Sequence, residues 1–331
     1  MTIAQPLGMH HVTAIATDPQ RNVDFYREVL GLRLVKQTVN YDAPDTYHLY
    51  YGDEAGHPGT ILTFFPWPNA PRGRRGTGQA TTTAFSVPEG SLGYWQQRLR
   101  ARGVEIIEQA TRESDDVLAL ADPDGLRLEL VAHPGDRRAG WPDGPVPVEH
   151  AVRGLFGVVL TEGAMEGTDA MLRERLGFQV VEEAPGRTRY GVGDAAPGRV
   201  VDVVADPRGQ QGLTAAGTVH HIAWRAPDRD IQRAWREALV EAGVTVTPII
   251  DRQYFESIYF REPGGVLLEI ATDPPGFTRD EPLLELGRRL RLPPWLEPRR
   301  EAIEALLPPL KLGELGDDAG DSPAGETDST Q

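Results

Sequence analysis

The chain has 331 residues, 40% hydrophobic and 25% charged, a composition typical of a globular protein with room for two domains. It contains no cysteine, which excludes disulfides, thiolate metal sites and cysteine nucleophiles, so any metal must be held by His, Asp or Glu. The net charge of −15 argues against nucleic-acid binding. Because the sequence shows neither a secretion signal nor an apolar run of membrane-spanning length, we expect a cytoplasmic protein without a membrane partner.

Most of the chain is expected to consist of four repeats of one pattern. Each repeat opens with a short apolar strand, continues with an amphipathic helix that a glycine ends, and closes with further strands. The repeats occupy residues 7–67, 79–134, 149–206 and 216–273. A linker rich in Pro and Gly, residues 135–148, divides the chain into halves.

The periodicity places one helix in each repeat, at residues 22–30, 93–102, 168–176 and 230–242. It places three strands after the helix in the first repeat but only two in each of the others. With the opening strands, the predicted strands are residues 10–16, 32–39, 46–51, 59–65, 81–87, 117–120, 126–131, 155–160, 188–192, 199–204, 220–226, 257–261 and 266–271.

The pattern changes after the fourth repeat. Residues 274–312 are expected to form a helical extension, with helices at 283–290 and 297–307 that cap one end of the fold or pack along a domain interface. Residues 313–331 are rich in Gly, Asp, Ser and Thr and carry no basic residue, so we expect a disordered acidic tail.

Four βαβββ repeats predict a specific α+β architecture. One such repeat forms a curved sheet that cannot close alone, so two repeats must pair into an open, cup-shaped sheet lined by side chains. Four repeats therefore predict two cups.

Paired histidines in two of the opening strands suggest which repeats pair. His10-His11 and His220-His221 open the first and fourth repeats, and Glu269 lies four residues after Gly265 in the last strand of the fourth. Since metal–ligand bonds are about 2.0–2.2 Å long, His11 and His221 can share a metal only if these two repeats pair. The positions that match Glu269 in the other repeats hold Thr63, Glu129 and Asp202. The cup of the second and third repeats lacks histidines at the matching positions, so we expect it to be a scaffold.

Two histidines and one carboxylate are the facial triad of non-haem Fe(II) oxygenases, and this predicts Fe(II) bound by His11, His221 and Glu269. A zinc site of the same composition stays open on ligand type, although the HExxH spacing is absent. Neighbouring residues of a strand face opposite ways, so His10 and His220 must point elsewhere or reach the pocket through a bend.

Two further polar residues fit either a catalytic or an ordinary structural role. Tyr259 and Arg252 precede Glu269 on and before the adjacent strand, where a tyrosine can exchange a proton and an arginine can hold an anion. An exposed strand tyrosine and a loop arginine fit the sequence equally well. The remaining histidines do not recur at equivalent positions of the repeats and are interpreted as surface or structural residues: His48, His57, His133 and His150.

Taken together, these motifs resemble the vicinal oxygen chelate (glyoxalase/bleomycin-resistance/dioxygenase) superfamily, in particular its four-module ring-cleaving dioxygenases that act on hydroquinones and chlorohydroquinones. The resemblance covers about residues 8–312. It is carried by His10-His11-Val12-Thr13, Tyr47-His48-Leu49-Tyr50-Tyr51, Pro58-Gly59-Thr60, Glu149-His150-Ala151, Val219-His220-His221, Tyr254-Phe255-Glu256-Ser257, Pro263-Gly264-Gly265-Val266 through Glu269, and Gly276-Phe277-Thr278.

The resemblance implies the vicinal oxygen chelate fold, with Fe(II), or alternatively Mn(II), on His11, His221 and Glu269. It also implies that the pocket is lined by four catalytic residues: His10, His220, Arg252 and Tyr259. The implied reaction opens the ring of a small aromatic diol with O2, and Tyr259 or His220 supplies a proton. We also expect a homo-oligomer. The alternatives are a catechol extradiol dioxygenase, a glyoxalase-like metal-dependent isomerase or lyase, and a metal-free binding protein.

Overall fold

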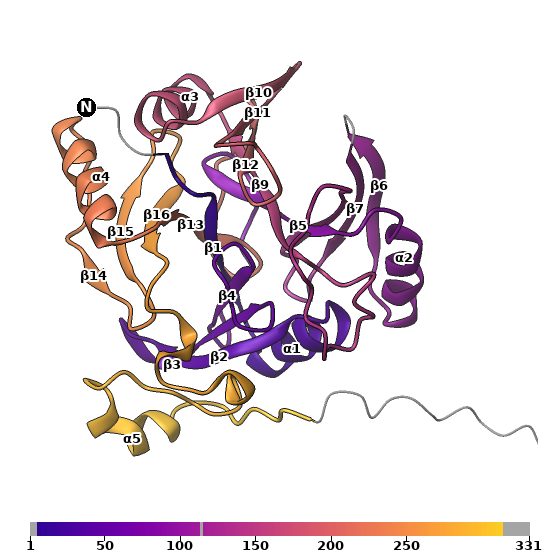
Figure 1. The fold of residues 1–331 in the computed structure, drawn as a ribbon, viewed down its shortest axis with the longest axis vertical. Coiled ribbons are helices and arrows are strands. Elements are labelled where there is room, and N and C mark those ends of the chain that lie inside the picture. Colours follow the sequence, from indigo (N-terminus) through magenta and orange to yellow (C-terminus); the bar gives the residue numbers. More distant parts are fainter. Residues whose placement is uncertain (1–4, 113–114, 314–331) are drawn as a thin grey trace, which may run out of the picture.

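The protein is described from a computed structural model that covers residues 5–112 and 115–313. The predicted acidic tail, except for its first residue, lies outside the described residues. The strands form two eight-stranded sheets that stand side by side, with the opening strand of the first repeat near the middle of the molecule (Figure 1).

The first sheet, called the site sheet below, joins strands from both ends of the chain. They are β1 (Met9–Ala16), β2 (Arg33–Asn40), β3 (Ala43–Gly52), β4 (Ile61–Pro66), β13 (Val219–Ala226), β14 (Ile250–Asp251), β15 (Glu256–Arg261) and β16 (Leu267–Thr272). Their order in the sheet is β14-β15-β16-β13-β1-β4-β3-β2. The antiparallel pairing of β1 with β13 at its centre therefore joins the first and fourth repeats.

The second sheet is built in the same way from the two middle repeats. Its strands are β5 (Gln79–Val87), β6 (Ile106–Arg112), β7 (Asp115–Ala121), β8 (Arg127–Ala132), β9 (Gly154–Glu162), β10 (Gln179–Ala184), β11 (Arg187–Gly191) and β12 (Val200–Ala205). Their order is β10-β11-β12-β9-β5-β8-β7-β6, with β5 and β9 antiparallel at the centre. The predicted fold class, four βαβββ modules paired into two open sheets, is thus confirmed.

Each repeat carries its helix between the first and second strands. The helices are α1 (Pro19–Asp24), α2 (Leu92–Ala101), α3 (Glu166–Ala170) and α4 (Arg229–Glu241); α1 and α3 each continue into one wider turn. The side chain of Asp18 caps α1 by accepting hydrogen bonds from the Gln20 and Arg21 amides. The glycine predicted to end α4, Gly243, has a φ of +83°. Residues with a side chain adopt this backbone conformation only at an energetic cost.

Three strands were missed in the sequence, and all of them lie at a sheet edge. Only two strands after the helix were located in each of the last three repeats, and β6, β10 and β14 are the third strands that the βαβββ pattern requires. Most residues of β10 are exposed, and β6 is similarly open, so neither shows a buried apolar face. Strands at a sheet edge need no such face, so hydrophobic periodicity does not detect them.

The C-terminal extension is less helical than predicted. The helix expected at 283–290 is a single 3₁₀ turn at Leu283–Glu285, and the one expected at 297–307 is a 3₁₀ turn followed by α5 (Arg300–Glu304). The extension runs beneath β2 and β3 in the view of Figure 1. It is anchored there by Lys36 of β2, a fully buried lysine whose Nζ donates to the Asp280 carboxylate at 2.7 Å and to Glu281.

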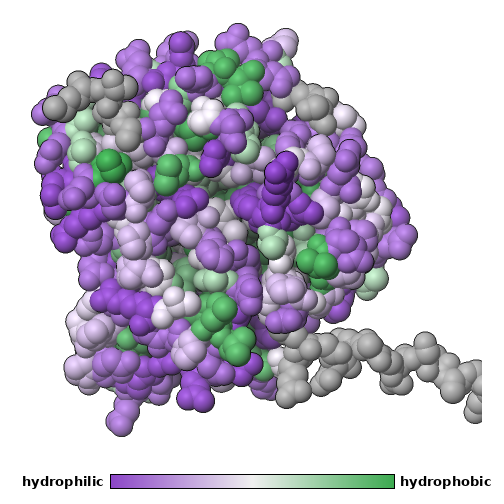
Figure 2. All heavy atoms as spheres, in the orientation of Figure 1, coloured by the Kyte–Doolittle hydropathy of each residue, from purple (hydrophilic) through white to green (hydrophobic). Residues whose placement is uncertain are grey.

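The face of the molecule drawn in Figure 2 is mainly polar. Figure 2 shows hydrophilic residues over most of the face in view, with hydrophobic residues in small separate groups. The largest buried side chains include Trp95 and Trp224, which belong to one continuous apolar cluster. None of the helices in the described part of the chain has the length and apolar character needed to cross a membrane.

Candidate metal centre

Three buried side chains from three strands of the site sheet converge on one point. His11 of β1, His221 of β13 and Glu269 of β16 are at most 5% exposed. Nε2 of His11 lies 3.4 Å from Nε2 of His221, and Oε2 of Glu269 lies 3.3 Å and 2.9 Å from these two nitrogens. Within the described residues, this is the one group of His and acidic side chains whose ligand atoms are close enough to share a metal ion.

The spacing of these three atoms fits a bound divalent metal. Bonds of about 2.1 Å set at right angles hold ligand atoms about 3.0 Å apart, and a tetrahedral angle holds them about 3.4 Å apart. The three observed distances lie within or just below this range. The buried Oε2 of Glu269 has no hydrogen-bond partner despite its two close imidazoles, as expected when lone pairs point at a common centre rather than at each other. Imidazole and carboxylate donors suit Fe, Mn and Zn.

Two β-bulges in the pairing of β1 with β13 set the orientation of the His10-His11 and His220-His221 pairs. In the β1–β13 pairing, Met9 faces Trp224 and His11 faces Ala223, so His10 is the extra residue of a bulge. A second bulge lies two residues further along, where Thr13 faces His221 and Ala14 faces Val219, which makes His220 the extra residue. Because a bulge redirects side chains, each histidine pair escapes the strict alternation of a flat strand.

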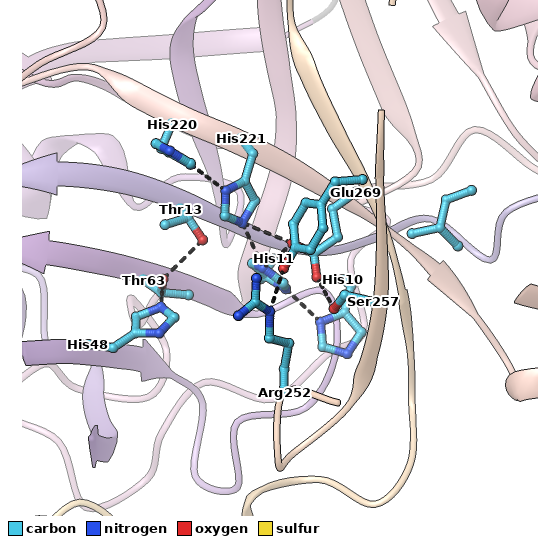
Figure 3. A network of polar contacts seen from close by, with 12 residues as sticks. His10, His11, Thr13, His48, Thr63, His220, His221, Arg252, Ser257 and Glu269 are labelled. Carbon is cyan, nitrogen blue, oxygen red and sulfur yellow. Dashed lines mark hydrogen bonds and ion pairs between the residues drawn. The ribbon is translucent and has the colours of Figure 1, made fainter. Parts of the chain in front are cut away.

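The bulges allow the preceding histidines to hold the ligand rings. Nδ1 of His10 lies 2.9 Å from Nδ1 of His11, and Nδ1 of His220 lies 2.7 Å from Nδ1 of His221 (Figure 3). If His11 and His221 ligate through Nε2, their Nδ1–H groups donate these hydrogen bonds, which fixes the tautomer and orientation of each ligand ring. Burial lowers the pKa of His220 to about 3 and that of His10 well below its ordinary value, so both are neutral acceptors at neutral pH.

The carboxylate is oriented by a serine from the neighbouring strand. Oγ of Ser257 on β15 donates to Oε1 of Glu269, which leaves Oε2 to face the histidines. Burial alone would raise the pKa of Glu269, but the adjacent His11 and His221 outweigh it and hold the pKa well below its usual range. The pKa of His221 is lowered by burial. An ionised carboxylate beside a neutral imidazole is the protonation state that a metal requires.

The position opposite Glu269 is occupied by a threonine instead of a second acid. β1 pairs in parallel with β4 so that Thr13 faces Thr63, and β13 pairs in parallel with β16 so that Ala223 faces Glu269. Thr63 is thus the counterpart of Glu269. Its Oγ1 lies 3.0 Å from Oγ1 of Thr13 and 2.7 Å from Nε2 of His48, so it belongs to a hydrogen-bonded chain and leaves this side of the centre without a carboxylate.

A cavity of about 340 Å³, at the lower end of the range for ligand pockets, opens onto His11 and His221. Its walls are largely apolar and aromatic, with Phe65, Trp67, Phe255 and Leu267 among them. Tyr259 and Arg252 also line it, and Nε of Arg252 donates to the Tyr259 hydroxyl at 3.2 Å. Burial, followed by the charge of Glu269, raises the pKa of Tyr259, so its hydroxyl stays protonated.

Of the four residues predicted to act beside the metal, three line this cavity and one does not. His220, Arg252 and Tyr259 line it, whereas His10 is not part of its wall. The His10 ring instead packs against that of Phe255, with centroids 5.0 Å apart. Its expected place in the pocket is therefore not observed, because the bulge turns it onto the imidazole of His11.

Sequence reasoning missed several cavity residues, of which His48 is the most prominent. His48 lines the cavity, and its Nδ1 lies 2.9 Å from the Tyr50 hydroxyl while its Nε2 contacts Thr63. Its interpretation as a merely structural residue overlooked that His48 and Tyr50 share one face of β3, at a spacing of two residues. The other missed residues are Asn40, Tyr41, Asp42, Tyr50, Phe65, Trp67, Phe255 and Leu267.

The second sheet uses the same positions for ion pairs. Ala84 faces Glu129 and Val159 faces Asp202, so these acids are the counterparts of Thr63 and Glu269. Nη1 of Arg112 donates to Glu129 at 2.6 Å. Asp202 accepts hydrogen bonds from Arg187 and Arg189. Guanidinium groups thus neutralise both carboxylates where the site sheet gathers its histidines.

Comparisons with known proteins agree with this architecture. The model of the Glyoxalase/Bleomycin resistance protein/Dioxygenase superfamily matches residues 8–130 and 158–270. A Bacillus subtilis (strain 168) protein named "Putative ring-cleaving dioxygenase MhqO" is 45% identical over 310 residues, which cover 93% of this chain and 98% of that protein. The chlorohydroquinone/hydroquinone 1,2-dioxygenase of Sphingobium indicum is 36% identical over 299 residues, covering 88% of this chain and 92% of the relative.

Solved structures show the same fold. A crystal structure from Bacillus subtilis subsp. subtilis str. 168, described as a "putative dioxygenase", superposes with a TM-score of 0.90 at 43% identity and covers 94% of this chain and 99% of its own. Glyoxalase I from Zea mays gives a TM-score of 0.60 at 17% identity over 80% of this chain and 92% of its own, which is a likeness of fold alone.

Proposed function

The chain belongs to the Glyoxalase/Bleomycin resistance protein/Dioxygenase superfamily, and we propose that it is an Fe(II)-dependent dioxygenase that opens the ring of a hydroquinone-type diol with O2. The substrate class is a para-diol, with or without further ring substituents, because one relative is named for both chlorohydroquinone and hydroquinone. Mn(II) is the alternative metal on the same ligands.

One observation carries the proposal: two imidazoles and one carboxylate converge beside an aromatic cavity that His11 and His221 line, and a threonine stands where a fourth protein ligand would be. Three protein ligands on one side leave room for a substrate oxygen and for O2. The relatives named as ring-cleaving dioxygenases support this chemistry over the others that the superfamily includes.

The chain's own residues would bind and orient the diol. His11, His221 and Glu269 would hold the Fe(II), which when bound supplies the redox chemistry that links the electron-rich ring to O2. The aromatic walls, with Phe65 and Phe255 among them, would pack against the ring and exclude water. Arg252, a permanent cation, would stabilise the phenolate form of the diol.

Two groups would supply the proton that the reaction of the diol with O2 requires. The Tyr259 hydroxyl is protonated because burial raises its pKa, and Arg252 fixes its position. If His220 accepts from His221 through Nδ1, its proton resides on Nε2, which remains to serve as a donor in the cavity. Either group would act as a general acid at the reacting centre.

A glyoxalase-like isomerase or lyase is disfavoured by Thr63. Enzymes of that kind usually recruit a second acid, and here the counterpart of Glu269 is a hydroxyl bonded to Thr13 and His48. A catechol extradiol dioxygenase would use the same ligands and differs only in the diol, so it is separated by substrate preference.

Oxygen uptake is the direct test. Fe(II)-loaded protein is mixed with a panel of substituted hydroquinones and catechols, and O2 consumption is followed with an electrode. Uptake with hydroquinones supports the proposal, and uptake with catechols alone selects the extradiol alternative. Turnover of a substrate without O2 would reject both. The cytoplasmic location and the homo-oligomeric state stay predictions.

A further inference from the structure

An ion pair at the wall of the cavity links the first and fourth repeats. Nη1 of Arg252 donates to Oδ2 of Asp42 at 3.0 Å, and the two residues lie 210 positions apart in the chain. Both line the cavity. Asp42 lies in the turn that joins β2 to β3, and Arg252 follows β14 in the loop that leads to β15. The pair therefore joins the first and fourth repeats at the wall of the cavity that His11 and His221 also line.

The two partners differ in how firmly they are held. The side chain of Arg252 is 19% exposed, and its Nε donates a hydrogen bond to the Tyr259 hydroxyl. The guanidinium carbon of Arg252 also lies over the Tyr259 ring, 5.3 Å from the ring centroid. The side chain of Asp42 is 75% exposed and marks the outer side of the cavity. Ion pairs with such an exposed partner are weak and easily exchanged. A competing carboxylate inside the cavity could therefore take the place of Asp42 on Arg252.

The proposed reaction makes such a carboxylate where there was none. Cleavage of hydroquinone between a hydroxylated carbon and its neighbour breaks one ring C–C bond and adds both atoms of O2, so the product keeps every carbon and hydrogen atom of the diol and gains two oxygen atoms. The hydroxylated carbon becomes a carboxylic acid and its neighbour an aldehyde, and the proton that the acid then loses goes to solvent. The diol enters uncharged, and the product leaves with a negative charge that a guanidinium binds strongly.

We propose that Asp42 is a positioning residue that controls release of the anionic product by competing with it for Arg252. The inference rests on the proposed function. With the diol bound, the ion pair holds Arg252 beside Tyr259. When the carboxylate forms, it displaces Asp42 from the guanidinium. Asp42 then displaces the product and restores the starting geometry.

The test measures binding of cis,cis-muconate, a six-carbon unsaturated dicarboxylate, to the full-length protein by calorimetry at low ionic strength. Metal-free protein isolates the contribution of Arg252 from that of the metal. Asp42→Asn should bind muconate about tenfold more tightly than the unaltered protein, because Arg252 loses its competitor. Arg252→Gln should bind it at least about tenfold more weakly. Asp230→Asn, which removes another exposed acid paired with an arginine, should bind it as the unaltered protein does.

If Asp42 had only a structural role, its replacement would loosen the cavity and weaken muconate binding, whereas competition for Arg252 predicts tighter binding. Equal or weaker binding by Asp42→Asn therefore overturns the inference. A parallel titration with uncharged hydroquinone should show little difference between Asp42→Asn and the unaltered protein. If Asp42→Asn tightens muconate binding but no diol supports O2 uptake, the carboxylate site stands and the proposed function fails. If O2 uptake is found without tighter binding, the inference alone fails.

Discussion

The Nε2 atoms of His11 and His221 lie 3.4 Å apart, although 210 residues separate the two histidines in the chain. The register of β1 and β13 brings them together, since Thr13 faces His221 while His11 faces Ala223. Each histidine therefore stands two residues away from the pairing partner of the other. The candidate metal centre therefore needs both ends of the chain, with one ligand from the first repeat and two from the fourth.

Replacement of either histidine should have the same effect on metal affinity. His11→Ala and His221→Ala should each lower affinity for Fe(II) by at least about a hundredfold, because loss of a residue that merely supports a ligand already costs about 10–100-fold. His133→Ala, remote from the three ligand strands, should keep full affinity. Metal content after dialysis, measured by atomic emission, checks this. A variant His11→Ala that retains one iron per chain would show that the metal binds elsewhere.

A carboxylate at the position of Thr63 should close the open side of the centre. Thr63→Glu, and the shorter Thr63→Asp if the buried site rejects the larger residue, should retain metal but lose at least about tenfold in O2 uptake. The reason is that the counterpart of Glu269 would then occupy a position meant for substrate or O2. Thr63→Ser, which keeps the hydroxyl between Thr13 and His48, is the control. Unchanged uptake by the acidic variants with full metal content would contradict the assignment.

Removal of the Tyr259 hydroxyl should slow the reaction without releasing the metal. General acids contribute about 10²–10⁴-fold, so Tyr259→Phe should lower kcat by about a hundredfold or more while metal content stays constant. Tyr190→Phe, which removes a tyrosine hydroxyl bonded to Asp169 in the second sheet, should leave kcat unchanged. Steady-state O2 uptake gives both values. Equal kcat for Tyr259→Phe and the unaltered protein would leave His220 as the proton donor.

A buried pair of acids near the junction of the repeats should make stability depend on pH. Glu162 is 1% exposed and its Oε1 has no hydrogen-bond partner, and burial together with the charge of Glu262 raises its pKa to about 8. Between pH 4.5, its ordinary pKa, and pH 8, the folded protein binds a proton that the unfolded chain has lost. The stabilisation is therefore complete below pH 4.5 and is lost as pH rises, by at most about 1.4 kcal/mol per pH unit.

Glu162→Gln removes this titration and should be more stable than the unaltered protein at pH 8, with the advantage shrinking toward pH 5. Urea unfolding at both pH values measures the difference. Glu166→Gln, an exposed glutamate on α3, serves as the control. An advantage that grows as pH falls would have the wrong sign for this explanation.

The repeat pattern and the histidine pairs suffice to predict the fold class, because His11 and His221 occupy equivalent places in equivalent repeats. Glycines at fixed places in the repeats, such as Gly243 after α4 and Gly265 before β16, allow the repeats to be aligned with one another. What the sequence conceals are features set by pairing across strands. The bulges at His10 and His220 exist only in the β1–β13 pair, so the orientation of these rings could not be read from alternation.

The missed site residues have the same origin. Asp42 and Arg252 lie near opposite edges of the site sheet and meet only in the folded chain, and no spacing in the sequence relates them. His48 lay within a motif that carried the family resemblance, and its two-residue spacing from Tyr50 was the available signal. The helix expected at residues 283–290 failed because contacts such as those of Lys36 with Asp280 and Glu281 hold the extension in an irregular path.

The central claim is that this centre inserts O2 into an aromatic diol. Fe(II)-loaded protein is mixed anaerobically with hydroquinone and then exposed to ¹⁸O2, and the product is analysed by mass spectrometry. One ¹⁸O atom should be retained in the new carboxylate, whereas the aldehyde oxygen exchanges with water and is not diagnostic. A ring-opened product whose carboxylate carries no ¹⁸O would contradict the account.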